Sequence, residues 1–184
     1  MTRKTVTELY TQAQTSFADN VSGAITPALL RQFCLDFLDT IRPSYASLAL
    51  TTEISKATTA TYATFTWNTL IIAQAPDYSV SLASGTVTRS GGPASARIEF
   101  SIDAKGANNS ITSFALFVDN AETPWAQSNT STSATDAQSF AFTAVNYSTS
   151  LTPQYEIRIK TTAPGNILLS NGVLVVENIP VNTN

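Results

Sequence analysis

The sequence predicts a mainly β protein, an antiparallel β-sandwich or jelly roll preceded by a small N-terminal helical segment. Short alternating segments separated by turn formers run from residue 62 to 179, and no helical period interrupts them. Strands at such regular spacing are typical of sandwiches and jelly rolls, whereas a βαβ fold requires helices between its strands. We therefore divide the 184 residues into a helical segment at 1–50, a linker at 51–61, whose alternative is an edge strand, and a β-sandwich domain at 62–184.

Two helices are expected in the first 50 residues. Apolar residues recur every four positions from Leu9, which predicts a short amphipathic helix over residues 7–17. Thr26 and Pro27 form a start signal for the second helix, because a threonine hydroxyl caps free N–H groups and proline fits the first helical position. This second helix is expected to end at Ile41, before an Arg-Pro pair.

The second helix carries an apolar stripe that needs a partner. The stripe follows the 3.6-residue helical period: Leu30, Phe33, Phe37, Leu38 and Ile41. Two helices of this length cannot close a core by themselves, so we expect the stripe to be buried against the β-domain, sister subunits or a larger assembly. We assign these five residues to anchoring and assembly. Cys34 lies within the same stripe, and we expect it to be a buried small hydrophobic residue.

Alternation along the β-domain predicts its strands. Residues 97–103 place isoleucine and phenylalanine on one face and polar side chains on the other, as in a strand with one dry face. Residues 111–118 are apolar on both faces, which predicts a central strand. A polar, low-complexity stretch at 126–137 is expected to be an exposed loop. Two last strands, 167–169 and 173–176, are expected on either side of an Asn-Gly turn.

The composition excludes several classes of partner. Only 12% of the residues are charged, against about 25% in an average domain, while 28 threonines and 20 serines supply the polar surface. The ten Lys and Arg residues are scattered, which argues against a nucleic-acid binder. No apolar run approaches the length of a membrane span, and the N-terminus has no signal-peptide core. We expect no nucleic-acid partner, no membrane partner and synthesis without a signal peptide.

The residue types also limit the chemistry. The chain has no histidine, so the commonest general base and zinc ligand are missing, and a single cysteine permits neither an intrachain disulfide nor a CxxC metal site. The carboxylates Glu99, Asp103, Asp119 and Glu156 lie at solvent-facing strand positions or beside turns. We assign no catalytic residue, no metal ligand and no cofactor, and we expect that the protein is not an enzyme.

One aromatic residue is a candidate binding residue. Trp125 follows a proline in a predicted loop, where an exposed indole could stack on a sugar ring. Polar residues around Asn108 and Asn129 would complete such a glycan contact. The alternative is an aromatic side chain packed over a sheet edge.

Two segments resemble known proteins. Residues 17–27 (FADNVSGAITP), followed by Leu30-Arg31 and an apolar helix, resemble a segment near the N-terminus of tailed-bacteriophage virion proteins. The region 62–179 resembles the trimeric jelly rolls of the tumour-necrosis-factor and complement-globular-head type, chiefly through its closing strands at 155–160, 167–169 and 172–179. The sequence departs from that family at 151–154 (LTPQ), where a Gly-Asp pair is usual.

These resemblances imply a homotrimeric virion protein that associates with capsid proteins, or with tail- or portal-associated proteins. They imply a head fibre, a capsid decoration protein, or a tail or collar appendage, located in the virion. A receptor-binding module that recognises host surface glycans is the alternative, and an enzyme acting on polysaccharide is the least favoured.

Overall fold

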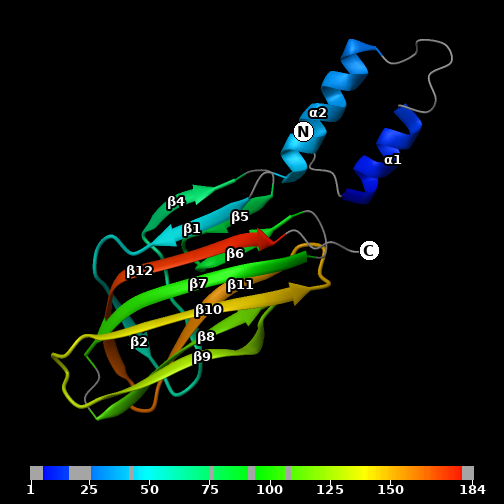
Figure 1. Ribbon diagram of the computed structural model, residues 1–184. Coiled ribbons are helices and arrows are strands. Elements are labelled where there is room, and N and C mark those ends of the chain that lie inside the picture. Colours follow the sequence, from blue (N-terminus) through cyan, green and yellow to red (C-terminus); the bar gives the residue numbers. More distant parts are fainter. Residues whose placement is uncertain are drawn as a thin grey trace. The chain divides into compact units, whose positions relative to one another are not determined.

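The computed structural model describes residues 6–16, 26–41, 44–74, 77–90, 94–106 and 109–179. Contacts divide the chain into two compact units, residues 1–43 with 180–184, and residues 44–179. The elements, all labelled in Figure 1 except β3, are α1 (Val6–Ser16), α2 (Pro27–Ile41), β1 (Tyr45–Ala49), β2 (Ile54–Thr58), β3 (Ala63–Thr64), β4 (Thr69–Ala73), β5 (Tyr78–Ser81), β6 (Thr86–Arg89), β7 (Ala94–Lys105), β8 (Ser110–Val118), β9 (Ala121–Ser131), β10 (Gln138–Ser148), β11 (Gln154–Thr161) and β12 (Gly165–Ile179).

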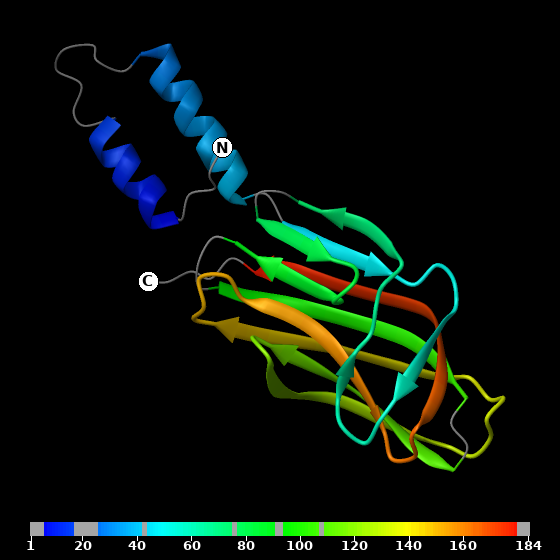
Figure 2. The same cartoon turned by 180° about the vertical axis from the view of Figure 1, so that it is seen from behind.

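The helical unit contains two helices that lie side by side and contact each other (Figures 1 and 2). The expected bounds of α2 are confirmed, and so is its cap, because Thr26 Oγ1 accepts a hydrogen bond of 3.2 Å from the Leu29 N–H. The described part of α1 ends at Ser16, and Phe17 lies outside the described residues. Among the described residues, no helix combines the length and the apolar character that crossing a bilayer requires.

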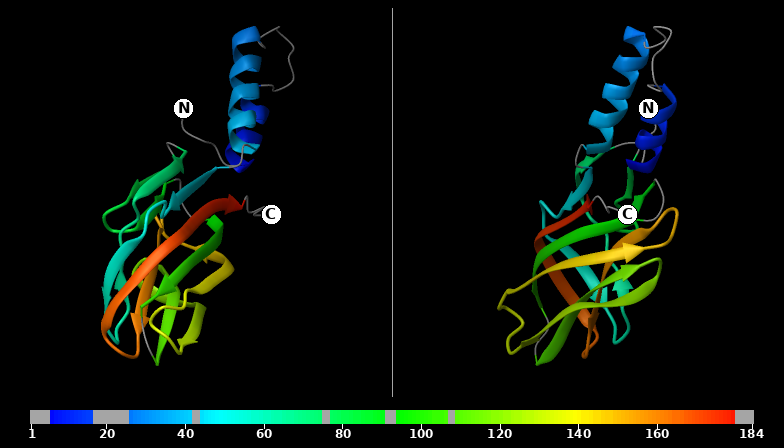
Figure 3. Two further views of the ribbon diagram at one scale, coloured as in Figure 1. Left: turned by 90° about the vertical axis from the view of Figure 1, so that its left-hand side faces the viewer. Right: turned by 45° about the vertical axis from the view of Figure 1, so that its right-hand side comes forward.

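The other unit is a two-layer antiparallel sandwich, as the sequence predicts. Sheet A has the strand order β10-β7-β12-β1-β4, with β2 also paired to β12. Sheet B has the order β5-β6-β11-β8-β9, with β3 also paired to β11. The two sheets form the two layers visible in Figures 1 and 3. The predicted central strand is β8, which pairs with β11 on one side and β9 on the other.

Aromatic side chains from both sheets fill the core. Phe114 of β8 lies in sheet B, and its ring is 4.7 Å from that of Phe140 and 5.4 Å from that of Phe100, centroid to centroid, both in sheet A. Phe65, in the segment after β3, packs on the same ring at 6.2 Å. Phe114, Phe140 and Phe65 are almost completely buried. Such edge-on and tilted ring pairs add to the free energy gained by burial, so they hold the two layers together.

The sandwich begins earlier than the expected boundary at residue 62. β1 lies in the segment expected to be helical, and β2 lies in the segment expected to be a linker. Both strands pair with β12 and belong to sheet A. Leu48 of β1 is completely buried in the core. The expected linker at 51–61 therefore contains a strand. Alternation failed here because four of the five β1 side chains are buried, and because Ile54 is the only large apolar residue of β2.

The last two expected strands are one strand. β12 continues through Asn171 and Gly172, where its register with β7 shifts, so the pair forms a bulge rather than a turn. Asn171 takes a φ of 52°, which asparagine tolerates better than most residues. A Cβ on Gly172 would lie 3.1 Å from Leu50 and 3.2 Å from Trp67. The Asn-Gly pair thus allows the backbone to pack closely against the core.

The expected loop at 126–137 is wrong for residues 126–131, which belong to β9, and correct for residues 132–137, which connect β9 to β10. Three amide side chains join β9 to β10, the edge strand of the other sheet. Gln127 Oε1 accepts a hydrogen bond from the Ala141 N–H, Asn129 Nδ2 donates to the Ser139 carbonyl at 3.0 Å, and Gln138 Nε2 donates to the Thr130 carbonyl at 2.7 Å. An edge strand paired on one side needs no apolar alternation, so its polar sequence resembles that of a loop.

Tyr155 of β11 is completely buried, and its hydroxyl has no hydrogen-bond partner among the described residues. Burial raises its pKa to about 12, with Asp119 adding to the rise and Arg89 opposing it. The folded protein therefore holds the protonated phenol more strongly than the unfolded chain, whose tyrosine pKa is about 10. The resulting contribution to stability is complete below about pH 10 and is lost as the pH rises toward 12.

We predict that Tyr155→Phe changes the free energy of unfolding at pH 7 by about 1 kcal/mol or less, because no hydrogen bond is lost. The variant should also lose less stability than the parent between pH 10 and pH 12. Denaturant unfolding across this pH range measures both effects. Tyr147→Phe, which removes an exposed hydroxyl, is the control and should follow the parent curve. Parallel alkaline curves for Tyr155→Phe and the parent would contradict the prediction.

Candidate functional site

Exposed apolar side chains occur at several places, and two surfaces, one on each unit, are candidate interaction sites. The first is the outward stripe of α2, and the second is the outward face of sheet A around β10 and β12. Large contiguous apolar patches on a protein surface commonly mark interaction sites.

The α2 stripe contains most of the residues assigned to assembly. Leu30, Phe37 and Leu38 are 51%, 47% and 55% exposed, and Phe33 is partly buried. Ile41 ends α2, and its side chain lies outside the described residues. Cys34 is exposed, so the expectation that it is buried is wrong for the single chain. The stripe that the sequence predicts thus exists on α2 and points away from the rest of the described helix pair.

Among the described side chains of α2, the one that is buried is polar. Asp36 is only 5% exposed and accepts a hydrogen bond of 2.7 Å from Gln32 Nε2. Leu9 of α1 is buried as well. A helix pair that stood alone would be expected to bury leucine and phenylalanine before an aspartate. The arrangement indicates that the stripe is reserved for another surface.

A shallow groove of about 490 Å³ runs along the outward face of sheet A. Its lining residues come from three adjacent strands: Glu99, Phe100 and Ser101 of β7, Ala141, Phe142 and Thr143 of β10, and Val173 and Val175 of β12. In the register, Ser101 lies opposite both Ala141 and Val173. Val145 and Tyr147 continue the exposed row along β10. The sequence did not lead us to predict this surface. The residues that could have indicated it are the alanine, threonine and valine at the outward positions of β10.

The charged groups of this face are paired with one another. Arg97 Nη2 lies 2.6 Å from Glu177 Oε2, and Arg97 Nε lies 3.5 Å from Glu99 Oε1. Asp103 accepts hydrogen bonds from Ser139 and from Asn171, and these bonds hold its pKa below the ordinary value despite a small opposing effect of burial. The strip between these groups consists of small neutral side chains. The face therefore suits close contact with another neutral surface better than recognition of a charged ligand.

A polar and aromatic cluster covers part of the outward face of sheet B. The Arg158 guanidinium lies 4.2 Å above the Phe117 ring and pairs with Glu156, and Lys160 Nζ lies 4.1 Å above the Tyr62 ring. The Tyr62 and Phe117 rings are in contact at 5.4 Å. Because these groups bind one another, the cluster is best explained as packing that covers sheet B.

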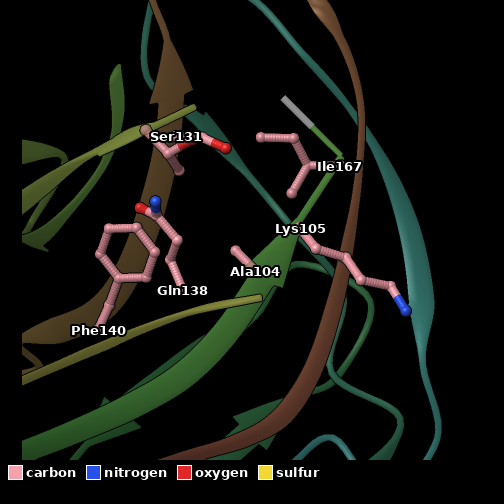
Figure 4. A pocket seen from close by; sticks show the side chains of 7 residues that line it. Ala104, Lys105, Ser131, Gln138, Phe140 and Ile167 are labelled. Atoms are coloured by element: carbon pink, nitrogen blue, oxygen red, sulfur yellow. The ribbon is translucent and has the colours of Figure 1, made fainter. Parts of the chain in front are cut away.

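A small cavity lies at one end of the sandwich, between the side chains drawn in Figure 4. It is lined by Ala104, Lys105, Thr112, Ser131, Gln138, Phe140 and Ile167. The volume open to the centre of a water molecule is about 10 Å³, which is enough for about one water. Gln138 Oε1 is buried without a protein partner among the described residues, whereas Lys105 points away and pairs with Glu53 at 3.2 Å. The cavity is too small for an organic ligand.

Trp125 lies in β9, not in a loop, and is 39% exposed. Asn129 uses its amide to bind the Ser139 carbonyl, and Asn108 lies outside the described residues.

The four carboxylates considered for catalysis lie in different parts of the fold. Glu99 and Asp103 belong to β7 in sheet A, and Glu156 belongs to β11 in sheet B. Asp119, in the β8–β9 turn, accepts a hydrogen bond of 2.9 Å from the Gln154 N–H. Within the described ranges, no three His, Cys, Asp or Glu side chains are grouped so that they could hold a metal ion.

Comparison with known proteins identifies the fold. No protein-family model matches the chain, and no curated protein matches it. A crystal structure of murine APRIL matches at 10% identity with a TM-score of 0.53, covering 75% of this chain and 100% of that chain. The globular domain of zebrafish complement 1qA protein matches at 11% identity and a TM-score of 0.53, covering 76% and 98% of the two chains.

A third structure, the Eiger TNF of S. frugiperda, matches at 16% identity and a TM-score of 0.52, covering 78% of this chain and 97% of that one. At these identities the likeness concerns the fold alone. The chain therefore has a jelly roll of the tumour-necrosis-factor and complement-globular-domain type, with a small helical segment before it.

Proposed function

We propose that this protein is a structural component of a bacteriophage particle that forms a trimer through its β-domain and attaches through its N-terminal region. The observation that carries this proposal is the exposed stripe of α2, where Leu30, Phe37 and Leu38 face solvent while Asp36 is buried. Such a stripe favours a part of an assembly over a monomer that acts alone. A head fibre, a capsid decoration protein, or a tail or collar appendage would fit this role.

The virion assignment is supported by the sequence pattern at 17–31, of which residues 17–25 lie outside the described residues. In this proposal the protein is made in the host cytoplasm and resides in the virion. Capsid proteins, or tail- or portal-associated proteins, would bind its N-terminal region. The role requires no cofactor and no catalytic residue.

The trimer is supported by the resemblance to trimeric jelly rolls and by the neutral groove on sheet A. Ala141, Thr143, Val173 and Val175 present small side chains there, and small side chains permit close approach of a second surface. The ion pairs of Arg97 lie at the border of this strip, where charges usually remain at an interface rim.

We predict that the full chain has three times the monomer mass of 19.6 kDa in solution, and that Ala141→Arg converts it to monomer. A long charged side chain in the groove would prevent close contact, yet it would point to solvent in the single chain and leave the fold intact. Sedimentation equilibrium measures the mass. Ala83→Arg, at an exposed turn position of the other sheet, is the matched control and should remain trimeric. A monomeric parent chain would overturn the trimer.

We predict that deletion of residues 1–43 abolishes incorporation into particles and leaves the sandwich folded. Residues 44–179 form a compact unit with its own core, so circular dichroism of the shortened chain should retain its β signature. Incorporation is measured by the protein content of purified particles. If the shortened chain still entered particles, the attachment role of the N-terminal region would be wrong.

A receptor-binding role toward host surface glycans is the second candidate, and the exposure of Trp125 favours it. If this role is correct, binding to a glycan array should fall about 5- to 150-fold in Trp125→Ala, because the loss of one aromatic stacking contact costs about 1–3 kcal/mol. Tyr147→Ala removes an exposed aromatic side chain from the other sheet and is the control. No binding by the parent chain would leave the purely structural role.

A further inference from the structure

We propose that α2 packs against the α2 helices of the other copies, with Leu30, Cys34 and Phe37 forming the seam of a parallel helical bundle. This inference rests on the proposed trimer and identifies the surface that covers the stripe. The occupant of this seam is a second copy of this chain, and the particle proteins of the proposed function would bind the part of the N-terminal region that lies outside the seam.

The spacing of the exposed residues matches a helical seam. Leu30, Cys34, Phe37 and Ile41 follow one another at intervals of four, three and four residues. The mean interval is about 3.7 residues, close to the 3.6 residues of one helical turn, so the four residues form one line along the side of α2. Leu30, Cys34 and Phe37 are all exposed, so this line is free along the described part of the helix.

The other helix of the unit does not supply the cover. α1 contacts α2, and the side of α2 on which Asp36 is buried is opposite the seam on the helical period. Gln32, one turn before Asp36, is exposed and donates a hydrogen bond to the buried Asp36 carboxylate. The seam therefore faces away from α1, and the helix pair does not cover it.

The chain ties α2 closely to the surface proposed for the trimer. Three residues separate Ile41, the end of α2, from Tyr45, the start of β1. A fully extended chain crosses those four Cα–Cα steps in about 14 Å at most. β1 belongs to sheet A, which carries the neutral groove. A closed trimer built on that face gathers three copies of β1 around one axis, and the short connection then keeps the three α2 helices near each other.

The exposed area favours a tethered partner over a free one. Leu30 and Phe37, each about half exposed, and the exposed Cys34 offer roughly 300 Å² of apolar surface. A stable interface between separate proteins buries about 800 Å² on each partner, so these three side chains alone are too few to hold one. Copies already joined through their sandwiches meet at an effective concentration of about millimolar, and for them a short seam is sufficient.

The single cysteine provides a direct test in the full chain. Cys34 is a seam residue and the only thiol, so a short bis-maleimide can link copies only through it. We expect the trimer to yield covalent dimers at least about tenfold faster than the double variant Cys34→Ala, Ala28→Cys. Position 28 is exposed on a different side of α2, so its thiol should react with the reagent but rarely join two copies.

A second pair of variants tests the seam without moving the thiol. Phe37→Glu places a charge in the seam and should slow the cross-linking of Cys34 at least about tenfold. Leu35→Glu, at an exposed apolar position away from the seam, is its control and should have little effect. Both substitutions concern exposed side chains, and circular dichroism should report a folded sandwich in each.

The possible results separate this inference from the proposed trimer. A trimeric mass with fast, Phe37-dependent linking through Cys34 supports both. A trimeric mass with linking no faster than from position 28 overturns the bundle and leaves a particle protein as the cover of the stripe. A monomeric mass in sedimentation equilibrium overturns the trimer and the bundle together.

Discussion

Sheet A depends on the pairing of β12 with three other strands. Its later half, from Val173 on, pairs with β1, its earlier half pairs with β2, and its opposite edge pairs with β7 along most of its length. The bulge at Asn171 and Gly172 lets one strand serve both halves, because it shifts the register and brings the backbone against Leu50 and Trp67. Without this strand, the segments 45–49 and 54–58 would have no place in the sheet.

This arrangement explains why the outward face of sheet A is neutral. β12, β7 and β10 are neighbours, and their outward side chains form short rows across the sheet, such as Ala141, Ser101 and Val173. The charged residues of the same strands are paired at the ends of the rows, as in the contact of Arg97 with Glu177. The interior strip is thereby left to small side chains. A similar separation occurs on α2, where the exposed side is apolar and the polar Asp36 is covered.

Where one face of an element is buried, local sequence was sufficient to predict it. β7 shows this well, since Ile98, Phe100 and Ile102 alternate with polar residues and all three lie in the core. α2 was also predictable to its bounds, because Thr26 and Pro27 give a physical start signal. The jelly roll followed from these elements, and the comparisons confirm it.

The remaining elements are set by long-range pairing that no local pattern reveals. β9 is polar because it is an edge strand, and the partners of Gln127 and Asn129 lie in β10. The prediction that Cys34 is buried was wrong, because a helical stripe indicates that a face will be covered but not that the same chain covers it. The groove on sheet A was missed for a related reason, since outward alanine and threonine are ordinary for a wet face.

The amide bridges between β9 and β10 bear on how the domain responds to its surroundings. Neutral amide-to-backbone hydrogen bonds hold this side of the sandwich closed, and neither mobile ions nor protons in the ordinary pH range compete strongly with them. The same bridges occupy backbone groups that a stray β-segment would otherwise use. An exposed domain closed in this way tolerates changes of ionic strength that would loosen an edge held by ion pairs, and many copies can stand close together without fusing their sheets.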